Sequence, residues 1–103
     1  MRTISILGST GSIGCNTLKV VDFLSEPKFR VVALGAGKNV DKLAEQTARF
    51  EPELVALENE TCAEKFLEKL HELKAKPPRV ELGQKGLVEV ATHAEVDMVV
   101  SAT

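Results

Sequence analysis

The sequence predicts an α/β fold in which a doubly wound parallel sheet of about five strands is covered by helices. Two observations support this prediction. Short apolar runs alternate along the chain with segments whose apolar residues recur at helical spacing. A glycine-rich turn joins the first apolar run to the first helical segment. Strands separated by helices pair in parallel through right-handed crossovers. A chain of 103 residues is expected to form one domain.

The first strand is predicted over residues 3–7, a short apolar run. A helix is predicted over residues 12–24 and ends before Pro27, because proline cannot continue a helix. Its apolar residues recur at intervals of three and four, which predicts one buried stripe along the helix. The residues expected on that stripe are Ile13, Thr17, Leu18, Val21 and Leu24.

Three glycines, Gly8, Gly11 and Gly14, lie at the turn between this strand and helix. Strand, glycine turn and helix together are typical of the phosphate-binding start of a Rossmann-like dinucleotide fold. Glycine permits positive φ and close approach of a ligand, and the helix N-terminus attracts a pyrophosphate. Three hydroxyl side chains in the turn would add donors. The spacing departs from the usual Gly-x-Gly-x-x-Gly fingerprint, with Ser9 in place of its first glycine. The alternative is a tight turn that binds no ligand.

The later elements follow from the same patterns of apolar residues and breakers. Strands are predicted over residues 29–34, 54–57, 80–82 and 96–102, and helices over residues 40–50, 63–73 and 87–91. Asn39 is a favourable N-cap for the second helix, and residues 83–86 are predicted as a turn. The carboxyl ends of parallel strands share one edge, which is where ligands bind in such sheets. We expect the glycine turn, the Gly35–Asn39 loop and residues 101–103 to lie there.

The Gly35–Asn39 loop bears on the choice of cofactor. In NAD-specific folds of this type, a carboxylate at the end of the second strand binds the ribose 2′-hydroxyl. No carboxylate occurs between Val31 and Asn39, and the loop instead contains the cation Lys38. A cation without a nearby acid suits the 2′-phosphate of NADPH better than NADH. The alternative is that Lys38 is a solvated surface lysine.

Composition excludes several other classes of function. The net charge of −2 at pH 7 argues against binding of nucleic acid, which needs a basic excess. No apolar run approaches the ~20 residues of a membrane span, and no targeting segment is recognised, so a cytoplasmic location is expected. Two cysteines are too few for a disulfide framework, and Cys15 is expected to pack beneath the glycine turn. Neither His71 nor His93 has cysteines or acids at ligand spacing, so no metal site is expected in this chain.

Taken together, the two loops resemble the N-terminal part of the 1-deoxy-D-xylulose 5-phosphate reductoisomerases. The segments that carry the resemblance are residues 6–14 (ILGSTGSIG), 31–34 (VVAL) and 36–40 (AGKNV), followed by looser similarity as far as Val99. The resemblance extends over essentially the whole chain but only roughly the first quarter of a family member. The chain is therefore expected to be an N-terminal fragment of a longer enzyme.

The resemblance implies an activity for the full enzyme. It would rearrange 1-deoxy-D-xylulose 5-phosphate and reduce the product with NADPH to 2-C-methyl-D-erythritol 4-phosphate, a step of non-mevalonate isoprenoid biosynthesis. A divalent cation, Mg or Mn, would hold the oxygens of this phosphorylated sugar substrate, and the enzyme would be a homodimer. Catalytic and metal-binding residues are expected beyond Thr103, so the fragment alone is expected to be inactive.

The resemblance also assigns cofactor-binding residues within this chain. These are Thr10, Gly11, Ser12, Ile13, Gly37, Lys38 and Asn39. Ala102 and Thr103 are expected near the adenosine side of the cofactor. Gly35 stands where the family often has a side chain, and this glycine is expected to loosen the second loop.

Two other classes of function remain open from the sequence. The chain could be the dinucleotide domain of a semialdehyde dehydrogenase or of an atypical short-chain reductase, which share a Gly-x-Thr-Gly-x-x-Gly turn. Those enzymes would need a catalytic cysteine or a Tyr-x-x-x-Lys sequence downstream, and the chain contains no tyrosine. It could also be a non-catalytic module that senses nucleotides.

Overall fold

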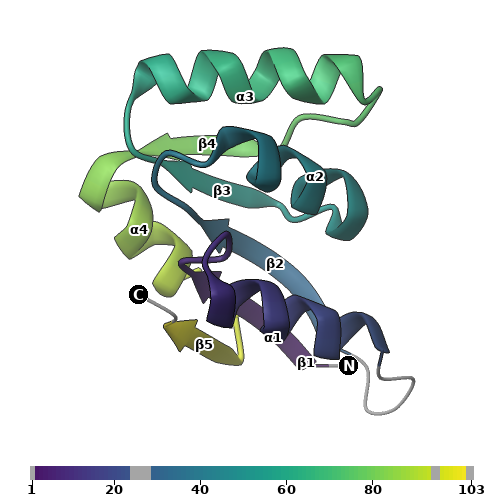
Figure 1. Ribbon diagram of the computed structural model, residues 1–103. Helices are drawn as coiled ribbons and strands as arrows, with labels where there is room; N and C mark the ends of the chain where they lie inside the picture. The colour runs from purple at the N-terminus through teal and green to yellow at the C-terminus, as the bar shows by residue number, and fades with distance from the viewer. Residues whose placement is uncertain (1, 24–28, 94–95, 102–103) are drawn as a thin grey trace.

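Strands and helices alternate along the chain in the computed structural model, which describes residues 2–23, 29–93 and 96–101 (Figure 1). The elements are β1 (Arg2–Leu7), α1 (Ser12–Phe23), β2 (Phe29–Gly35), α2 (Val40–Phe50), β3 (Leu54–Leu57), α3 (Glu60–Glu72), β4 (Arg79–Leu82), α4 (Gly83–Ala91) and β5 (Met98–Ser101). This order confirms the predicted alternation. The predicted end of the first helix at Leu24 lies outside the described residues.

The strands form one parallel sheet in the order β4-β3-β2-β1-β5. The chain steps outward from β1 to β4 and then returns to the free side of β1. The register aligns the carboxyl ends, because Leu7 pairs with both Gly35 and Ser101. The change in winding direction therefore falls beside the end of β1, where ligands bind in open sheets of this kind.

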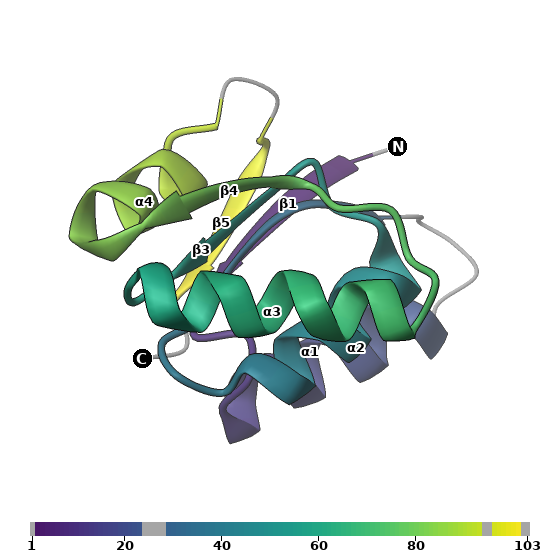
Figure 2. The ribbon, with the colours of Figure 1, turned by 90° about the horizontal axis from the view of Figure 1, so that it is seen from above.

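Helices cover both faces of this sheet. Figure 2 shows α1, α2 and α3 on one face and α4 on the other. The first three helices connect strands that step outward in one direction, whereas α4 precedes the return to β5. Since right-handed crossovers place helices on opposite faces when the direction reverses, the structure confirms the doubly wound fold. Within the described ranges, no helix is long and apolar enough to cross a membrane.

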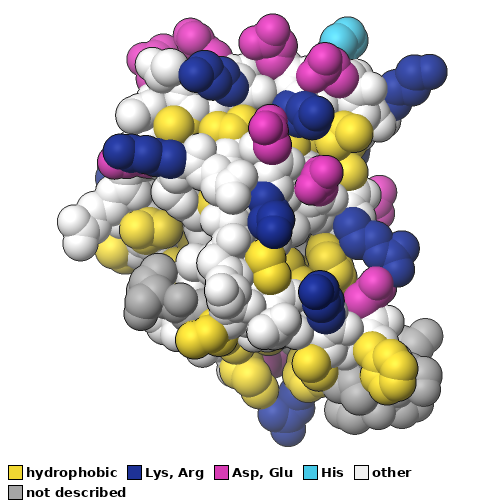
Figure 3. Space-filling model, viewed as in Figure 1, with side chains coloured by type: hydrophobic (Ala, Val, Ile, Leu, Met, Phe, Trp, Pro, Cys, Tyr) yellow, Lys and Arg dark blue, Asp and Glu magenta, His cyan; other side chains and the backbone are white. Residues whose placement is uncertain are grey.

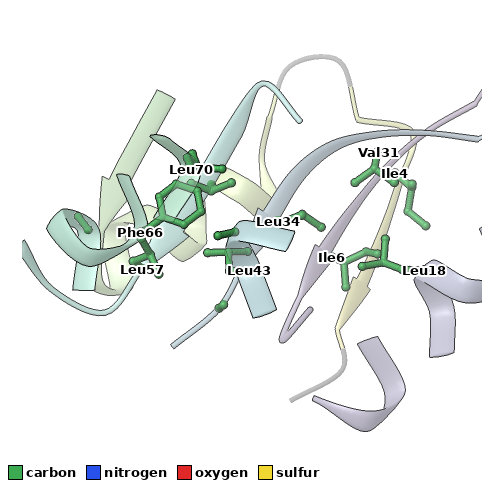
Figure 4. Close-up of a cluster of buried hydrophobic side chains, with 13 residues drawn as sticks. Ile4, Ile6, Leu18, Val31, Leu34, Leu43, Leu57, Phe66 and Leu70 are labelled. Atoms are coloured by element: carbon green, nitrogen blue, oxygen red, sulfur yellow. The ribbon is translucent and has the colours of Figure 1, made fainter. Parts of the chain in front are cut away.

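The core divides into two clusters, one on each face of the sheet. The larger cluster packs strand side chains against the first three helices, and Figure 4 shows it with Phe66 and Leu70 of α3 beside Leu43 of α2. The smaller cluster includes Val32 and Val90 and lies beneath α4. β2 and β3 are buried on both faces, which accounts for their nearly continuous apolar sequences.

The predicted stripe of α1 is partly wrong. Ile13 is 63% exposed, whereas Gly14 and Leu18 are the buried residues of the helix. α1 packs so closely on the preceding turn that Gly14 must face inward. With Gly14 on the inner side of the helix, Ile13 lies on the exposed side. In α3, Ala63, Phe66 and Leu70 are buried, whereas Leu67 is exposed, as is Leu73 directly after the helix.

The last two elements also differ from prediction. α4 begins at Gly83 directly after β4, so residues 83–86 form its first turn and not a separate loop. Gly83 has a φ of 67°, which lets the chain change direction without a linker. β5 spans only Met98–Ser101 in place of the predicted residues 96–102, and Ala102 lies outside the described residues. Met98 and Val99 are exposed because β5 is at the edge of the sheet.

The start of β5 is tied to the start of β1 at the amino edge of the sheet. The Thr3 N–H donates to Asp97 Oδ2 at 2.9 Å, and the Asp97 N–H donates to Thr3 O at 3.0 Å. The hydrogen bond from the Thr3 backbone, with a second from its hydroxyl, lowers the pKa of the Asp97 carboxyl below its ordinary value. The two hydrogen bonds between Thr3 and Asp97 hold the start of β5 against β1.

Candidate functional site

The turn between β1 and α1 is held by backbone hydrogen bonds from the neighbouring strand. The N–H groups of Gly8 and Ser9 donate to Gly35 O at 2.8 and 3.0 Å. Within the turn, the Gly11 N–H donates to Gly8 O at 3.2 Å, and the Cys15 N–H donates to Gly11 O at 2.9 Å, which begins α1. The end of β2 thus determines where the turn lies before any ligand binds.

The three glycines of this turn have three different roles. Gly8 alone among them has positive φ, 78°, and makes the sharp turn out of β1. A Cβ at Gly14 would lie 2.3 Å from Gly8 O, so this glycine lets α1 pack directly on the turn. Gly11 is exposed, and a Cβ there would meet only Gly8 O at 3.6 Å. Gly11 therefore leaves open surface at the N-terminus of α1, as close approach of a ligand requires.

The hydroxyl side chains of the turn are not equivalent. Ser12 is exposed and Thr10 is half-buried, but Ser9 is fully buried, and its Oγ has no hydrogen-bond partner among the described residues. The expectation that all three offer donors to a ligand is therefore wrong for Ser9. The half-buried Cys15 places its Sγ 3.6–3.7 Å from the Ser9 and Thr10 carbonyl oxygens, which confirms its predicted place beneath the turn.

The loop between β2 and α2 presents side chains to solvent. Gly37, Lys38 and Asn39 are all exposed. Asn39 Oδ1 accepts a hydrogen bond from the Lys42 N–H at 3.3 Å, which confirms its role as the N-cap of α2. The Lys38 side chain is 80% exposed, and its Nζ lies 3.8 Å from Glu58 Oε2 at the end of β3. The loop thus carries one cation with an acidic neighbour from the next strand.

Gly35 does not loosen this loop, contrary to expectation. It is the last residue of β2 and is buried. A Cβ at this position would lie 2.8 Å from Leu87 Cδ2 and 3.2 Å from Leu7 Cδ2. The missing side chain makes room for α4 to pack at the carboxyl edge of the sheet.

A cavity of about 430 Å³ lies at this edge, between the ends of β1, β2 and β3 and the start of α4. It brings the two loops together, and its lining residues are Gly8, Gly35, Ala36, Gly37, Leu57, Glu58, Gly83, Gln84 and Leu87. Of the predicted cofactor residues, only Gly37 lines the cavity; Thr10, Gly11, Ser12 and Ile13 continue along the turn next to Gly8. Figure 3 shows that the surface around this turn is largely backbone and uncharged polar groups.

Three lining residues come from α4 and were missed by the sequence reasoning: Gly83, Gln84 and Leu87. The only sequence signal there is the pair of glycines at positions 83 and 86, which predicts a turn and not the start of a helix. Ser101 lies beside Leu7 at the same edge, as predicted, while Ala102 and Thr103 lie outside the described residues.

In the described part of the chain, no group of three His, Cys, Asp or Glu residues is arranged to hold a metal ion. His93 does have an acidic neighbour that spacing did not reveal, since its Nε2 lies 3.3 Å from Glu53 Oε2. That pair lies near the start of β3, at the edge of the sheet away from the cavity. The described residues of the candidate site therefore include no cluster of side chains that could hold a metal ion.

The profile of the 1-deoxy-D-xylulose 5-phosphate reductoisomerase family matches residues 4–103. The chain belongs to this family. A 1-deoxy-D-xylulose 5-phosphate reductoisomerase of Glaesserella parasuis is 48% identical over 99% of the chain, and the chloroplastic enzyme of Oryza sativa is 46% identical over 97%. These alignments cover 25% and 21% of the two relatives. The chain thus spans about a quarter of the length of the curated reductoisomerases that it matches.

Solved reductoisomerase structures share the fold. A DOX-P reductoisomerase crystallised with NADPH, fosmidomycin and magnesium superimposes with a TM-score of 0.87 at 29% identity, over 100% of this chain and 24% of that one. The Zymomonas mobilis enzyme in complex with NADPH gives a TM-score of 0.76 at 29% identity, over 91% of this chain and 24% of that one.

Proposed function

We propose that residues 1–103 are the NADPH-binding domain of a 1-deoxy-D-xylulose 5-phosphate reductoisomerase. The observation that carries the proposal is the meeting of the β1–α1 turn and the β2–α2 loop around one cavity, beside the switch in strand order. Solved relatives with this fold are described as NADPH complexes, which supports the choice of ligand.

The β1–α1 turn would bind the pyrophosphate of NADPH. Its backbone N–H groups and the positive end of the α1 dipole attract an anion, and the exposed Gly11 leaves room for the phosphate oxygens to approach. Thr10, Ser12 and Ile13 flank Gly11 on this surface. The residues present therefore fit a dinucleotide, because no side chain at position 11 occupies the space proposed for the pyrophosphate.

The β2–α2 loop would bind the adenosine ribose and its 2′-phosphate. Lys38 Nζ could reach a phosphate because the side chain is mostly exposed, and Gly37 and Asn39 would contribute backbone and amide groups beside it. The loop has no carboxylate for a 2′-hydroxyl. The charge distribution therefore favours NADPH over NADH, although Glu58 opposes part of that preference.

For the complete enzyme we propose the family's reaction on 1-deoxy-D-xylulose 5-phosphate, as part of isoprenoid biosynthesis. NADPH would supply the hydride for the reduction, and this chain would bind and orient it. We further propose that the substrate site, the Mg or Mn site and the contacts of a homodimer belong to the remaining part of the enzyme. A cytoplasmic location is part of the same proposal.

A ligand titration tests the cofactor proposal. Fluorescence or calorimetric titration of the chain with NADPH, NADH and ATP should give the tightest binding for NADPH and clearly weaker binding for NADH. ATP binding as tight as NADPH binding would instead support a nucleotide-sensing module. No binding of either dinucleotide would contradict the proposal.

An activity assay tests whether the substrate and metal sites lie outside residues 1–103. The chain alone, supplied with 1-deoxy-D-xylulose 5-phosphate, NADPH and magnesium, is expected to show no turnover, because the described residues contain no metal-binding cluster. Oxidation of NADPH that depends on the sugar phosphate, followed at 340 nm, would show that the chain holds a substrate site.

A further inference from the structure

Gln46 is a buried polar residue on α2 whose amide reaches the phosphate-binding turn. The residue is only 9% exposed, and its Nε2 donates a 2.8 Å hydrogen bond to Ser9 O, 37 positions earlier in the sequence. Nε2 also lies 3.7 Å from Cys15 Sγ. Within the described residues, Gln46 Oε1 has no hydrogen-bond partner. An apolar side chain would avoid this unpaired group, so the contact with Ser9 is what the glutamine supplies.

The hydrogen bond from Gln46 fixes one peptide plane of the turn. The Ser9 N–H donates to Gly35 O, and the Ser9 carbonyl accepts from Gln46, so both sides of this residue are held. A trans peptide is planar, and its C=O and N–H groups point in opposite directions. Because the Ser9 C=O points toward α2, the Thr10 N–H points away from α2. Among the described residues, no backbone carbonyl accepts a hydrogen bond from the Thr10 N–H.

The same helix also begins at the other candidate binding loop. Asn39 caps α2, and Lys38 directly precedes this cap. α2 is therefore connected at its first turn to the loop proposed for the 2′-phosphate, and through Gln46 to the turn proposed for the pyrophosphate. A rigid helix that contacts both loops can set the spacing between them.

We infer that Gln46 is a positioning residue for cofactor binding: its amide holds the Ser9–Thr10 peptide so that the Thr10 N–H is presented to a pyrophosphate. The inference rests on the proposed function. Gln46 does not itself touch the cofactor, because its amide is occupied beneath the turn. Removing the amide should weaken the pyrophosphate contact and leave the ribose phosphate contact intact.

The test is a Gln46→Met variant, which keeps the length of the side chain and removes the donor. Thr47→Val is a matched control. Thr47 is also buried on α2, but its hydroxyl donates to Leu43 O within the same helix, so this change removes a buried hydrogen bond without affecting the turn. Two ligands are titrated into each protein. NADPH contains the pyrophosphate, and adenosine 2′-monophosphate contains only the ribose phosphate end.

In Gln46→Met we expect the affinity for NADPH to fall about three- to tenfold, as loss of one ordinary hydrogen bond predicts. Its affinity for adenosine 2′-monophosphate should stay within about twofold of wild type. Amide exchange at Ser9 should also become faster in the free protein, because the peptide that follows is no longer held. Thr47→Val should show none of these changes. Equal losses for both ligands, or unchanged NADPH affinity and Ser9 exchange, would overturn the inference.

A second variant decides the matter if Gln46→Met does not fold. In Gln46→Glu a carboxylate cannot donate to the Ser9 carbonyl, whereas the protonated carboxyl can. Position 46 is buried, and burial disfavours the charged form, so the pKa of a carboxyl there should rise above its ordinary value of about 4.3. NADPH affinity relative to wild type should therefore be low at pH 8 and recover as the pH is lowered to 5. A constant ratio across this range would refute the role of Gln46. A wild-type chain that binds neither ligand would instead refute the proposed function.

Discussion

The two segments that form the candidate site are built in opposite ways. In the β1–α1 turn, neighbouring elements hold the backbone, with Gly8 and Ser9 bonded to β2 and the Ser9 carbonyl bonded to α2. In the β2–α2 loop, Gly37 and Lys38 are exposed, and a Cβ added at Gly37 would meet no atom within 4 Å. The turn therefore exposes a fixed backbone, whereas the loop exposes side chains.

In the proposed cofactor site, this difference would separate affinity for any dinucleotide from selection among dinucleotides. A pyrophosphate is common to NADPH and NADH, so a rigid backbone site for it cannot discriminate between them. The 2′-phosphate is the group that differs, and it would meet the loop whose side chains can change without disturbing the core. Substitutions in the turn should therefore affect stability or all ligands together, and substitutions in the loop should affect the preference between ligands.

The largest expected effect is on folding. Gly14→Ala places a Cβ 2.3 Å from Gly8 O and 2.7 Å from Ser9 Cα, and backbone atoms on both sides cannot move away easily. We expect the free energy of unfolding to fall by roughly 3 kcal/mol or more. Gly37→Ala is the matched change in the other loop and should be nearly neutral. Urea denaturation of both variants measures the two changes in the free energy of unfolding. A Gly14→Ala protein as stable as wild type would contradict this prediction.

The next effect is on binding without loss of the fold. Gly11→Val should remain folded, because Gly11 is exposed and does not have positive φ, but the valine side chain would occupy the space proposed for the pyrophosphate. The affinities for NADPH and NADH should both fall by about a hundredfold or more, since the shared group is blocked. Titration with both cofactors, alongside circular dichroism, measures this. A folded variant with unchanged affinity would show that the cofactor does not approach this turn.

The sequence predicted the elements that depend on local pattern. The β1–α1 turn and the Asn39 cap were predicted because a glycine spacing and an N-cap residue are visible within a few positions. The parallel sheet followed from the alternation of strands and helices. Each of these features is encoded by neighbours along the chain.

The features that were missed depend on contacts between distant segments. The apolar stripe gave no reason to distinguish Gln46 from other polar residues of α2, because its partner Ser9 lies 37 positions away. The buried state of Gly35 depends on Leu87 from α4, which no local pattern reveals. Ile13 was misplaced for the same reason, since the close packing of Gly14 on the turn fixes the rotation of α1.

A smaller effect is expected at the selective loop. Lys38→Ala should weaken NADPH binding by about tenfold, the lower end of the range for a charge-assisted hydrogen bond, because the side chain is mostly exposed. NADH affinity should hardly change. Lys65→Ala, which removes an exposed lysine from α3, controls for the change in net charge. Equal losses for NADPH and NADH would mean that Lys38 serves the pyrophosphate, and the contrast between the two segments would not hold.

The smallest effect is a gain of affinity at Glu58. Its carboxylate lies 3.8 Å from Lys38 Nζ and lines the cavity, so in the proposed complex it would compete with the 2′-phosphate for the lysine and repel the phosphate charge. Both side chains are substantially exposed, which limits the strength of the pair. Glu58→Gln removes the charge and keeps the shape of the side chain, so NADPH affinity should rise about two- to fivefold while NADH affinity stays constant.

Salt dependence distinguishes this electrostatic explanation from a change in loop shape. If Glu58 acts through its charge, the gain in Glu58→Gln should shrink as the salt concentration rises from 50 to about 500 mM, because interactions between exposed charges are screened. Glu68→Gln on α3 changes the net charge equally, but its exposed side chain is not among those lining the cavity, so it should leave NADPH affinity unchanged. A gain that persists at high salt, or one that NADH shares, would place the effect of Glu58 in the shape of the cavity and not in the selection of the 2′-phosphate.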